Sequence, residues 1–203
     1  MQCRTRAAGA FQRLRERCPT GDLAVVAHSG VGRMLISALT GMPGEEALKG
    51  KLPYGSVILL LLSGERAFLG PTALPEELPP QTPDEGECHA LLREYGTPPH
   101  VIDHCKAVAE EGERLCAGLE GRGVSVDPAL VRAGALLHDI ARTQPHHGEA
   151  GALWLLKRGY GQLSALVGDH MALPEEEAAL PTEKAVVFLA DKLVRETGQV
   201  TLE

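Results

Sequence analysis

Aromatic residues are scarce in this chain, at 3% of its 203 residues, and long apolar runs are missing. The longest such run, VILLLL at 57–62, is far too short to span a bilayer. The five cysteines form no CxxC pair and no even-numbered framework, which argues against a disulfide framework. We therefore expect neither export nor membrane insertion, and a reduced cytoplasmic setting.

The chain also has no excess of basic residues, because its net charge is −7. This charge argues against nucleic acid or an anionic membrane as a partner held by a general basic field. It leaves room for a small phosphorylated ligand bound by a metal ion and a few local cations. The length suits one large domain or two small ones.

The residue pattern divides the chain into three parts. Residues 1–70 alternate between helix and strand, with a buried parallel strand predicted at 23–28, a helix at 33–39, a strand after Gly55-Ser56 and a hairpin turn at 63–66. Residues 71–87 hold five prolines among carboxylates and predict an extended linker. Residues 88–203 predict an all-α domain, with helices at 101–119, 129–142, 149–158, 162–171 and 183–194.

The adjacent pair His138-Asp139 lies in the apolar stretch ALVRAGALLHDIAR. Burial of an imidazole and a carboxylate is costly unless each finds a partner. His104, His170 and Asp191 each have apolar neighbours three or four residues away, which predicts that they also face inward. A single inward histidine is usually a core residue bonded to the backbone. Several together favour one shared divalent cation, since imidazoles and carboxylates are suitable ligands.

The same residues carry a resemblance to a known family. HCKAVA at 104–109, ALLHDIAR at 135–142 and FLADKL at 188–193 resemble the ligand segments of the HD superfamily of metal-dependent phosphohydrolases. HGEAGA at 147–152 and GDHM at 168–171 are similar to segments that add two histidines in members with two metals, among them bacterial enzymes that split dinucleoside tetraphosphates symmetrically. The resemblance implies one or two divalent transition-metal ions (Fe, Mn, Co, Ni or Zn), with these ligands: His104, His138, Asp139, His147, His170 and Asp191.

The resemblance also implies the chemistry of this half of the chain. Such metals activate water for attack on phosphorus, and the substrate would be a phosphate ester or anhydride, in particular a nucleotide or dinucleoside polyphosphate. Asp139 and Arg142 are the expected catalytic residues, with Arg142 reaching a phosphoryl oxygen; the alternative for Arg142 is a surface arginine at a helix end. Lys192 and Arg195 are further candidates for the same task. His146 and His100 are expected to lie outside the ligand set.

VVAHSGVGRML at 25–35 resembles the second-histidine segment of the histidine phosphatase superfamily. In that family His28 would complete a phosphate pocket, but the Arg-His-Gly motif with the nucleophilic histidine has no counterpart here. We therefore expect a vestigial pocket, and an incomplete sheet whose open edge favours self-association. The chain would then be a fragment of a longer protein that joins two phosphatase-like domains.

Three interpretations stay open at this point. The first is a hydrolase run by the all-α half. The second is a non-catalytic module that uses the same ligands to sense a metal or a nucleotide. The third is an inactive assembly piece of a larger multidomain phosphatase-like protein.

Overall fold

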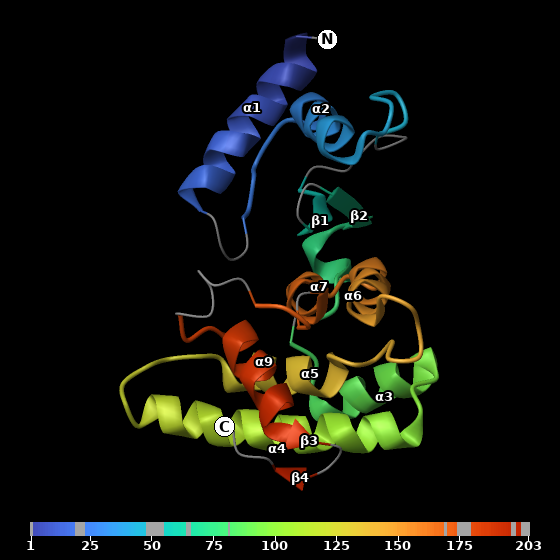
Figure 1. The fold of residues 1–203 in the computed structure, drawn as a ribbon. Coiled ribbons are helices and arrows are strands. Elements are labelled where there is room, and N and C mark those ends of the chain that lie inside the picture. The colour runs from blue at the N-terminus through green and yellow to red at the C-terminus, as the bar shows by residue number, and fades with distance from the viewer. Residues whose placement is uncertain are drawn as a thin grey trace. The chain divides into compact units, whose positions relative to one another are not determined.

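A computed structural model of the chain describes residues 2–18, 23–47, 55–63, 66–80, 82–168, 170–173, 180–195 and 198–199. Two compact units share the chain, unit 1 at 1–78 and unit 2 at 79–203. The elements of each unit are labelled in Figure 1. The limits 70 and 87 predicted for the linker remain a prediction.

Unit 1 combines two helices with a hairpin. Helix α1 spans Gln2–Arg17 and α2 spans Ser29–Thr40. Strands β1 (Val57–Ser63) and β2 (Arg66–Ala73) pair antiparallel, and a short 3-10 helix, η1, follows at Pro75–Glu77. The strand and hairpin predicted after Gly55-Ser56 are confirmed, although residues 64 and 65 of the turn lie outside the described part.

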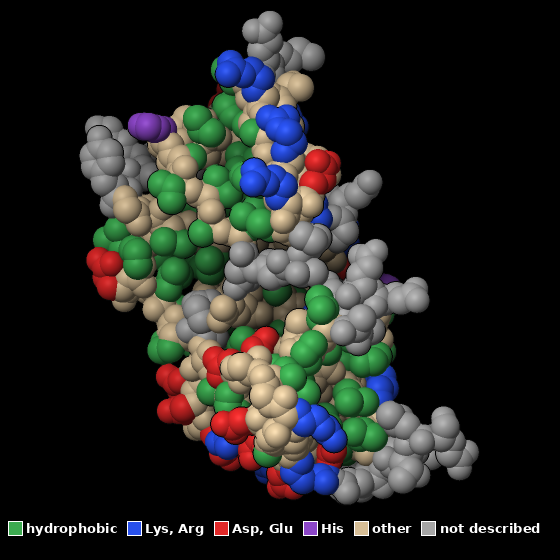
Figure 2. Space-filling view, turned by 90° about the vertical axis from the view of Figure 1, so that its left-hand side faces the viewer, with side chains coloured by type: hydrophobic (Ala, Val, Ile, Leu, Met, Phe, Trp, Pro, Cys, Tyr) green, Lys and Arg blue, Asp and Glu red, His purple; other side chains and the backbone are tan. Residues whose placement is uncertain are grey.

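The strand predicted at 23–28 is wrong. This segment is in no strand of the described structure, and its apolar side chains are exposed, with Val25 at 43% and Val26 at 101%. A buried strand needs a hydrogen-bonding partner, and the hairpin strands are paired with each other. Figure 2 shows hydrophobic side chains exposed beside Lys and Arg side chains in its upper part.

Unit 2 is built from helices, which confirms the predicted fold class of an α/β segment followed by an all-α domain. The helices are α3 (Glu85–Tyr95), α4 (Pro99–Glu120), α5 (Pro128–Leu137), α6 (His147–Lys157), α7 (Gly161–Gly168) and α9 (Glu183–Leu193). Two short strands follow, β3 (Val194–Arg195) and β4 (Gly198–Gln199). None of the helices in the described ranges has the length and hydropathy to cross a membrane.

Side chains at the helix starts explain where these helices begin. Asp84 and Glu87 form a reciprocal capping box at the start of α3. The Asp127 carboxylate accepts bonds from the first backbone N–H groups of α5, and Thr182 does the same for α9. Glu183 Oε1 also accepts a bond from the Asp127 backbone N–H, at 2.8 Å. The start of α9 is thus attached to the start of α5.

Two predicted helices end earlier than expected. The helix predicted at 129–142 ends at Leu137, and the one predicted at 162–171 ends at Gly168. In both cases a histidine beyond the end donates through Nδ1 to a carbonyl three residues back, His138 to Ala135 and His170 to Val167. A histidine can satisfy an unpaired carbonyl in the last turn in this way, so the chain leaves the helix there.

The core of unit 2 closes tightly around these helix ends. Leu137, Leu155 and Leu163 are fully buried. A Cβ placed on Gly134 would lie 2.7 Å from Leu166, so α5 and α7 approach as closely as a glycine allows. A Cβ on Gly148 would lie 3.2 Å from the Gly168 carbonyl and 3.4 Å from the His170 ring. The missing side chains therefore let α5, α6 and α7 meet where His138, His147 and His170 emerge.

A hydrogen bond from a distant loop also fixes the turn after His138. Thr97, in the loop between α3 and α4, donates through Oγ1 to the Ile140 carbonyl at 2.8 Å. Both residues are buried. This bond joins residues 43 positions apart in the sequence and anchors the segment that carries Asp139.

We expect Thr97→Val to lower the free energy of unfolding by about 1–3 kcal/mol, because the valine keeps the shape but leaves the buried Ile140 carbonyl without its donor. Thr97→Ser retains the hydroxyl and should lose much less. Urea unfolding followed by circular dichroism measures both. A valine variant as stable as the parent would contradict the anchoring role.

Candidate metal centre

Six residues from five parts of unit 2 meet at one place. His104 lies on α4 and Asp191 on α9, whereas His138 and Asp139 lie just beyond the end of α5. His147 opens α6, and His170 follows α7. Successive imidazole rings in the order His104, His138, His170, His147 have centroids 5.2–5.4 Å apart. The structure therefore brings together every ligand that the sequence predicts.

The two most buried histidines are fixed in one orientation. His138 is 1% and His170 is 2% exposed. Each donates its Nδ1 proton to a backbone carbonyl, at 2.7 and 2.6 Å respectively. With Nδ1 as the donor, a ring without a second proton has its lone pair on Nε2. Within the described part of the chain neither Nε2 atom has a hydrogen-bond partner.

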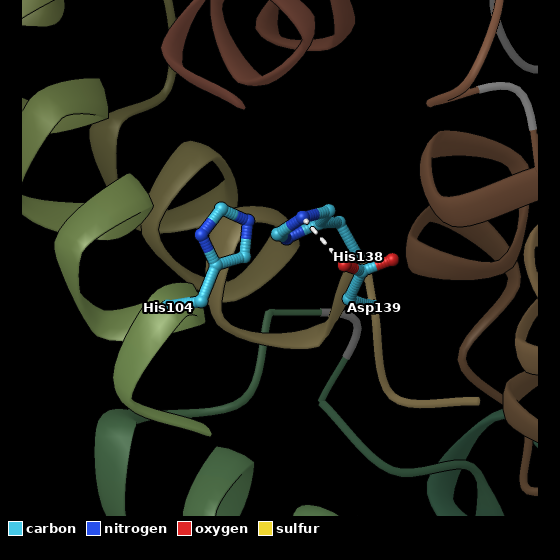
Figure 3. Close-up of side chains that lie close together, drawn as sticks. All are labelled: His104, His138 and Asp139. Carbon is cyan, nitrogen blue, oxygen red and sulfur yellow. Dashed lines mark ion pairs between the residues drawn. The ribbon is translucent and has the colours of Figure 1, made fainter. Parts of the chain in front are cut away.

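The first group of potential ligands is His104, His138 and Asp139, whose ligand atoms lie within 4.8 Å of one another. Figure 3 shows the His104 ring, which comes from α4, facing the His138-Asp139 pair. Asp191 closes this group. Its Oδ1 atom lies 3.2 Å from His104 Nε2 and 3.5 Å from His138 Nε2.

The second group is Asp139, His147 and His170, again within 4.8 Å of one another. Asp139 Oδ1 lies 3.2 Å from His147 Nε2 and 3.5 Å from His170 Nε2. Its other oxygen, Oδ2, lies 3.6 Å from His138 Nε2. Asp139 is thus shared between the two groups, with one oxygen directed to each.

Arg142 lies at the rim of the second group. Its Nη1 atom is 3.5 Å from Asp139 Oδ1 and 3.3 Å from His147 Nε2. The side chain is 51% exposed, so the guanidinium faces both the buried ligands and the solvent. An anionic ligand that reaches the ligand groups from the solvent would meet this cation.

The other histidines lie elsewhere. His146 is exposed and adopts a left-handed backbone, with φ at 52°, where the chain turns so that His147 enters α6. His100 is exposed as well. Both lie outside the two ligand groups, as expected. His28, in unit 1, is exposed and precedes α2 without a side-chain capping bond.

The two carboxylates make the site strongly negative. Burial by itself would raise the pKa of Asp139, but His170, His138 and Arg142 together lower it to about 2. Burial would likewise raise the pKa of Asp191, and His104, His138 and Lys192 outweigh it and lower the pKa. Both groups are therefore ionised at neutral pH, and they attract positive charge.

The histidines respond to the same charges. Burial would lower the pKa of His138, but Asp191, the Cys105 thiol and Asp139 raise it well above its ordinary value. The pKa of His147, in contrast, is lowered. Burial is the largest cause, and the positive charges of His170 and Arg142 lower it further. A positive charge is thus favoured between the two carboxylates, and a metal ion would compete there with a proton.

The donor set fits a divalent transition metal. Neutral imidazole nitrogens with carboxylate oxygens suit ions such as Mn, Fe, Co, Ni or Zn. The carbonyl bonds at Nδ1 are the supporting contacts that orient metal-binding histidines in general. The His138 and His170 Nε2 atoms each lie 3.5 Å from a carboxylate oxygen but make no hydrogen bond within the described residues, so they are available as metal ligands. Each group described here could hold one ion.

Sequence reasoning did not find every residue that shapes the site. Thr97 bonds to a backbone carbonyl 43 residues away, for which the sequence carries no signal. The fully buried Cys105 thiol is one of the groups that raise the pKa of His138. Its position on the apolar stripe beside His104 was the available signal. The side chain of Arg195, a further predicted candidate, lies outside the described residues.

Comparisons with known proteins agree with this geometry. Residues 101–196 match the family model described as HD domain, which is typical of metal-dependent hydrolases, and such domains bind divalent metals. Residues 1–70 match the model described as histidine phosphatase superfamily (branch 1). No solved structure matches this chain.

Two curated relatives are similar over about half of the chain. The "Uncharacterized protein MJ0778" of Methanocaldococcus jannaschii is 34% identical over 51% of this chain and 72% of its own length. A protein of Thermoplasma volcanium named tRNA (cytidine(56)-2'-O)-methyltransferase is 35% identical over 51% of this chain, but over 29% of its own length. The chain therefore belongs to the HD domain family through residues 101–196, and it carries a histidine phosphatase superfamily (branch 1) segment at residues 1–70.

Proposed function

We propose that unit 2 hydrolyses phosphate ester or anhydride bonds of nucleotides or dinucleoside polyphosphates with the help of bound divalent metal. One observation carries this proposal: two fully buried histidines are locked by their Nδ1 bonds so that their Nε2 atoms, which make no hydrogen bond within the described residues, face two ionised carboxylates. Membership in the HD domain family supports the same reaction class.

We assign one metal ion to each of the two ligand groups. His104, His138, Asp139 and Asp191 would hold one ion, and Asp139, His147 and His170 would hold a second. The division of the Asp139 oxygens between the groups supports its role as the shared ligand. Bound divalent ions supply Lewis acidity, which activates water and neutralises charge on phosphoryl oxygens.

The protein's own residues would bind and orient the substrate. Arg142 is half exposed and touches the second group, so its guanidinium can bond to phosphoryl oxygens as they arrive. Asp139 and Asp191 stay ionised at neutral pH and keep the ligand groups charged. The backbone bonds of His138 and His170 would hold both rings in one orientation.

The nucleotide substrate is supported by the resemblance of HGEAGA and GDHM to two-metal HD enzymes. The methyl transfer in the name of the Thermoplasma relative is not carried over, since this chain spans 29% of that protein. Self-association through the incomplete N-terminal sheet also stays a proposal, and sedimentation velocity at several concentrations tests it.

The proposal predicts two transition-metal ions per chain by elemental analysis of the purified protein. It also predicts that metal-loaded protein releases product from a panel of nucleotides and dinucleoside polyphosphates. A protein that binds both metal and nucleotide but releases no product is instead a sensing module. A protein that binds no metal contradicts the centre itself.

Asp139→Ala should abolish metal-dependent hydrolysis, because it removes the ligand shared by both groups. Metal binding and folding are linked, so a chelator should lower the melting temperature of the parent but leave that of the variant unchanged. Asp103→Ala, which removes an exposed carboxylate from α4, is the matched control and should behave like the parent. Full activity in Asp139→Ala would place the reaction elsewhere.

His28→Ala should leave turnover unchanged, because we propose that unit 1 contributes no catalysis in this chain. His28 is the only histidine within residues 1–70, so no second imidazole is present there to attack phosphorus. Phosphatase assays on metal-loaded protein measure the effect. A large loss of turnover with unchanged folding would make this half a working site.

A further inference from the structure

The two oxygens of Asp191 face different partners. Oδ1 lies 3.2 Å from His104 Nε2 and 3.5 Å from His138 Nε2, within the first ligand group. Oδ2 lies 2.5 Å from the Lys192 ammonium. The carboxylate therefore has one oxygen directed into the site and the other bound by a lysine.

Side chains of consecutive helix residues, such as Asp191 and Lys192, do not normally contact each other. Consecutive residues on a helix do not face each other, so both side chains must turn toward a common side to meet. The Lys192 ammonium also lies 5.2 Å from the centre of the Phe188 ring, one turn earlier on α9. The ring and the carboxylate together define where the ammonium lies.

The burial of the pair is uneven. The Asp191 side chain is 16% exposed, whereas that of Lys192 is 42% exposed. The lysine thus binds the carboxylate from the solvent side. Without it, Oδ2 would have to be satisfied by water, and the carboxylate could rotate about its Cβ–Cγ bond.

We propose that Lys192 is a positioning residue of the metal centre: its ammonium binds Asp191 Oδ2 and so keeps Oδ1 directed at His104 and His138. This inference rests on the proposed function, since Asp191 is a ligand only if the first group holds a metal. Supporting partners of this kind commonly change metal affinity 10- to 100-fold when they are removed.

Charge and positioning predict opposite effects. An ammonium close to a cation site repels the cation, so a purely electrostatic role means that removal of Lys192 strengthens metal binding. A positioning role means that removal weakens metal binding. The sign of the change therefore separates the two explanations, which a loss of activity alone would not do.

The test is a titration of the full-length chain with Co²⁺, followed by visible absorption and by calorimetry. Lys192→Met should weaken one of the two binding steps by about 10- to 100-fold and leave the other step unchanged. Lys192→Arg keeps a cationic donor and should restore much of the affinity. Because Lys192 is exposed, both variants should fold like the parent, and circular dichroism checks this.

Lys106→Met is the matched control. Lys106 is also an exposed lysine of unit 2 that pairs with a carboxylate, Asp103, at 3.3 Å, but that carboxylate lies outside both ligand groups. This variant should bind Co²⁺ like the parent. Unchanged or tighter binding by Lys192→Met overturns the positioning role. A parent protein that binds no Co²⁺ overturns the proposed metal centre, so the two failures are distinguishable.

Discussion

The burial of Asp139 is the constraint on which the arrangement of unit 2 depends. This carboxylate is 4% exposed and lies between three imidazoles and one guanidinium. An ionised carboxylate withdrawn from water without compensation would cost several kcal/mol. The surrounding elements must therefore deliver positive or proton-donating groups to one point, and they do so from α6 and from the segments that follow α5 and α7.

The helix ends, rather than the helix faces, supply most of these groups. His138 and His170 each terminate a helix by donating to its last turn, and the same bond selects which ring nitrogen carries the lone pair. Gly148 and Gly134 allow the helices behind these ends to approach closely. Helix termination, ring orientation and close packing are thus parts of one arrangement.

The chain has a net charge of −7, yet the site meets solvent through two cations, Arg142 and Lys192. Each touches one of the two carboxylates. The phosphate binding that we propose would therefore rely on local cations and not on a basic protein as a whole. Unit 1 differs, because His28 is exposed and the apolar segment 23–28 before it is unpaired within the described structure.

Much of the fold and site could be predicted from the sequence. Apolar spacing identified the helices around His104 and Asp191, and the HD resemblance named six residues that the structure brings together. The sequence could not show that 129–142 and 162–171 stop early, because periodicity describes a face and not the capping bond that ends it. It also misjudged 23–28, since an apolar run does not specify a pairing strand.

The residue types and their order in the candidate site were thus determined by the sequence: four histidines, two carboxylates and one arginine, all in the helical half. Only the tertiary structure decided that Asp139 would face both groups, that Thr97 would hold Ile140 and that Lys192 would bind the outer oxygen of Asp191. The physical reason is that these contacts depend on how side chains are oriented and how the helices pack. Contacts between residues tens of positions apart depend on how helices pack, which local patterns do not encode.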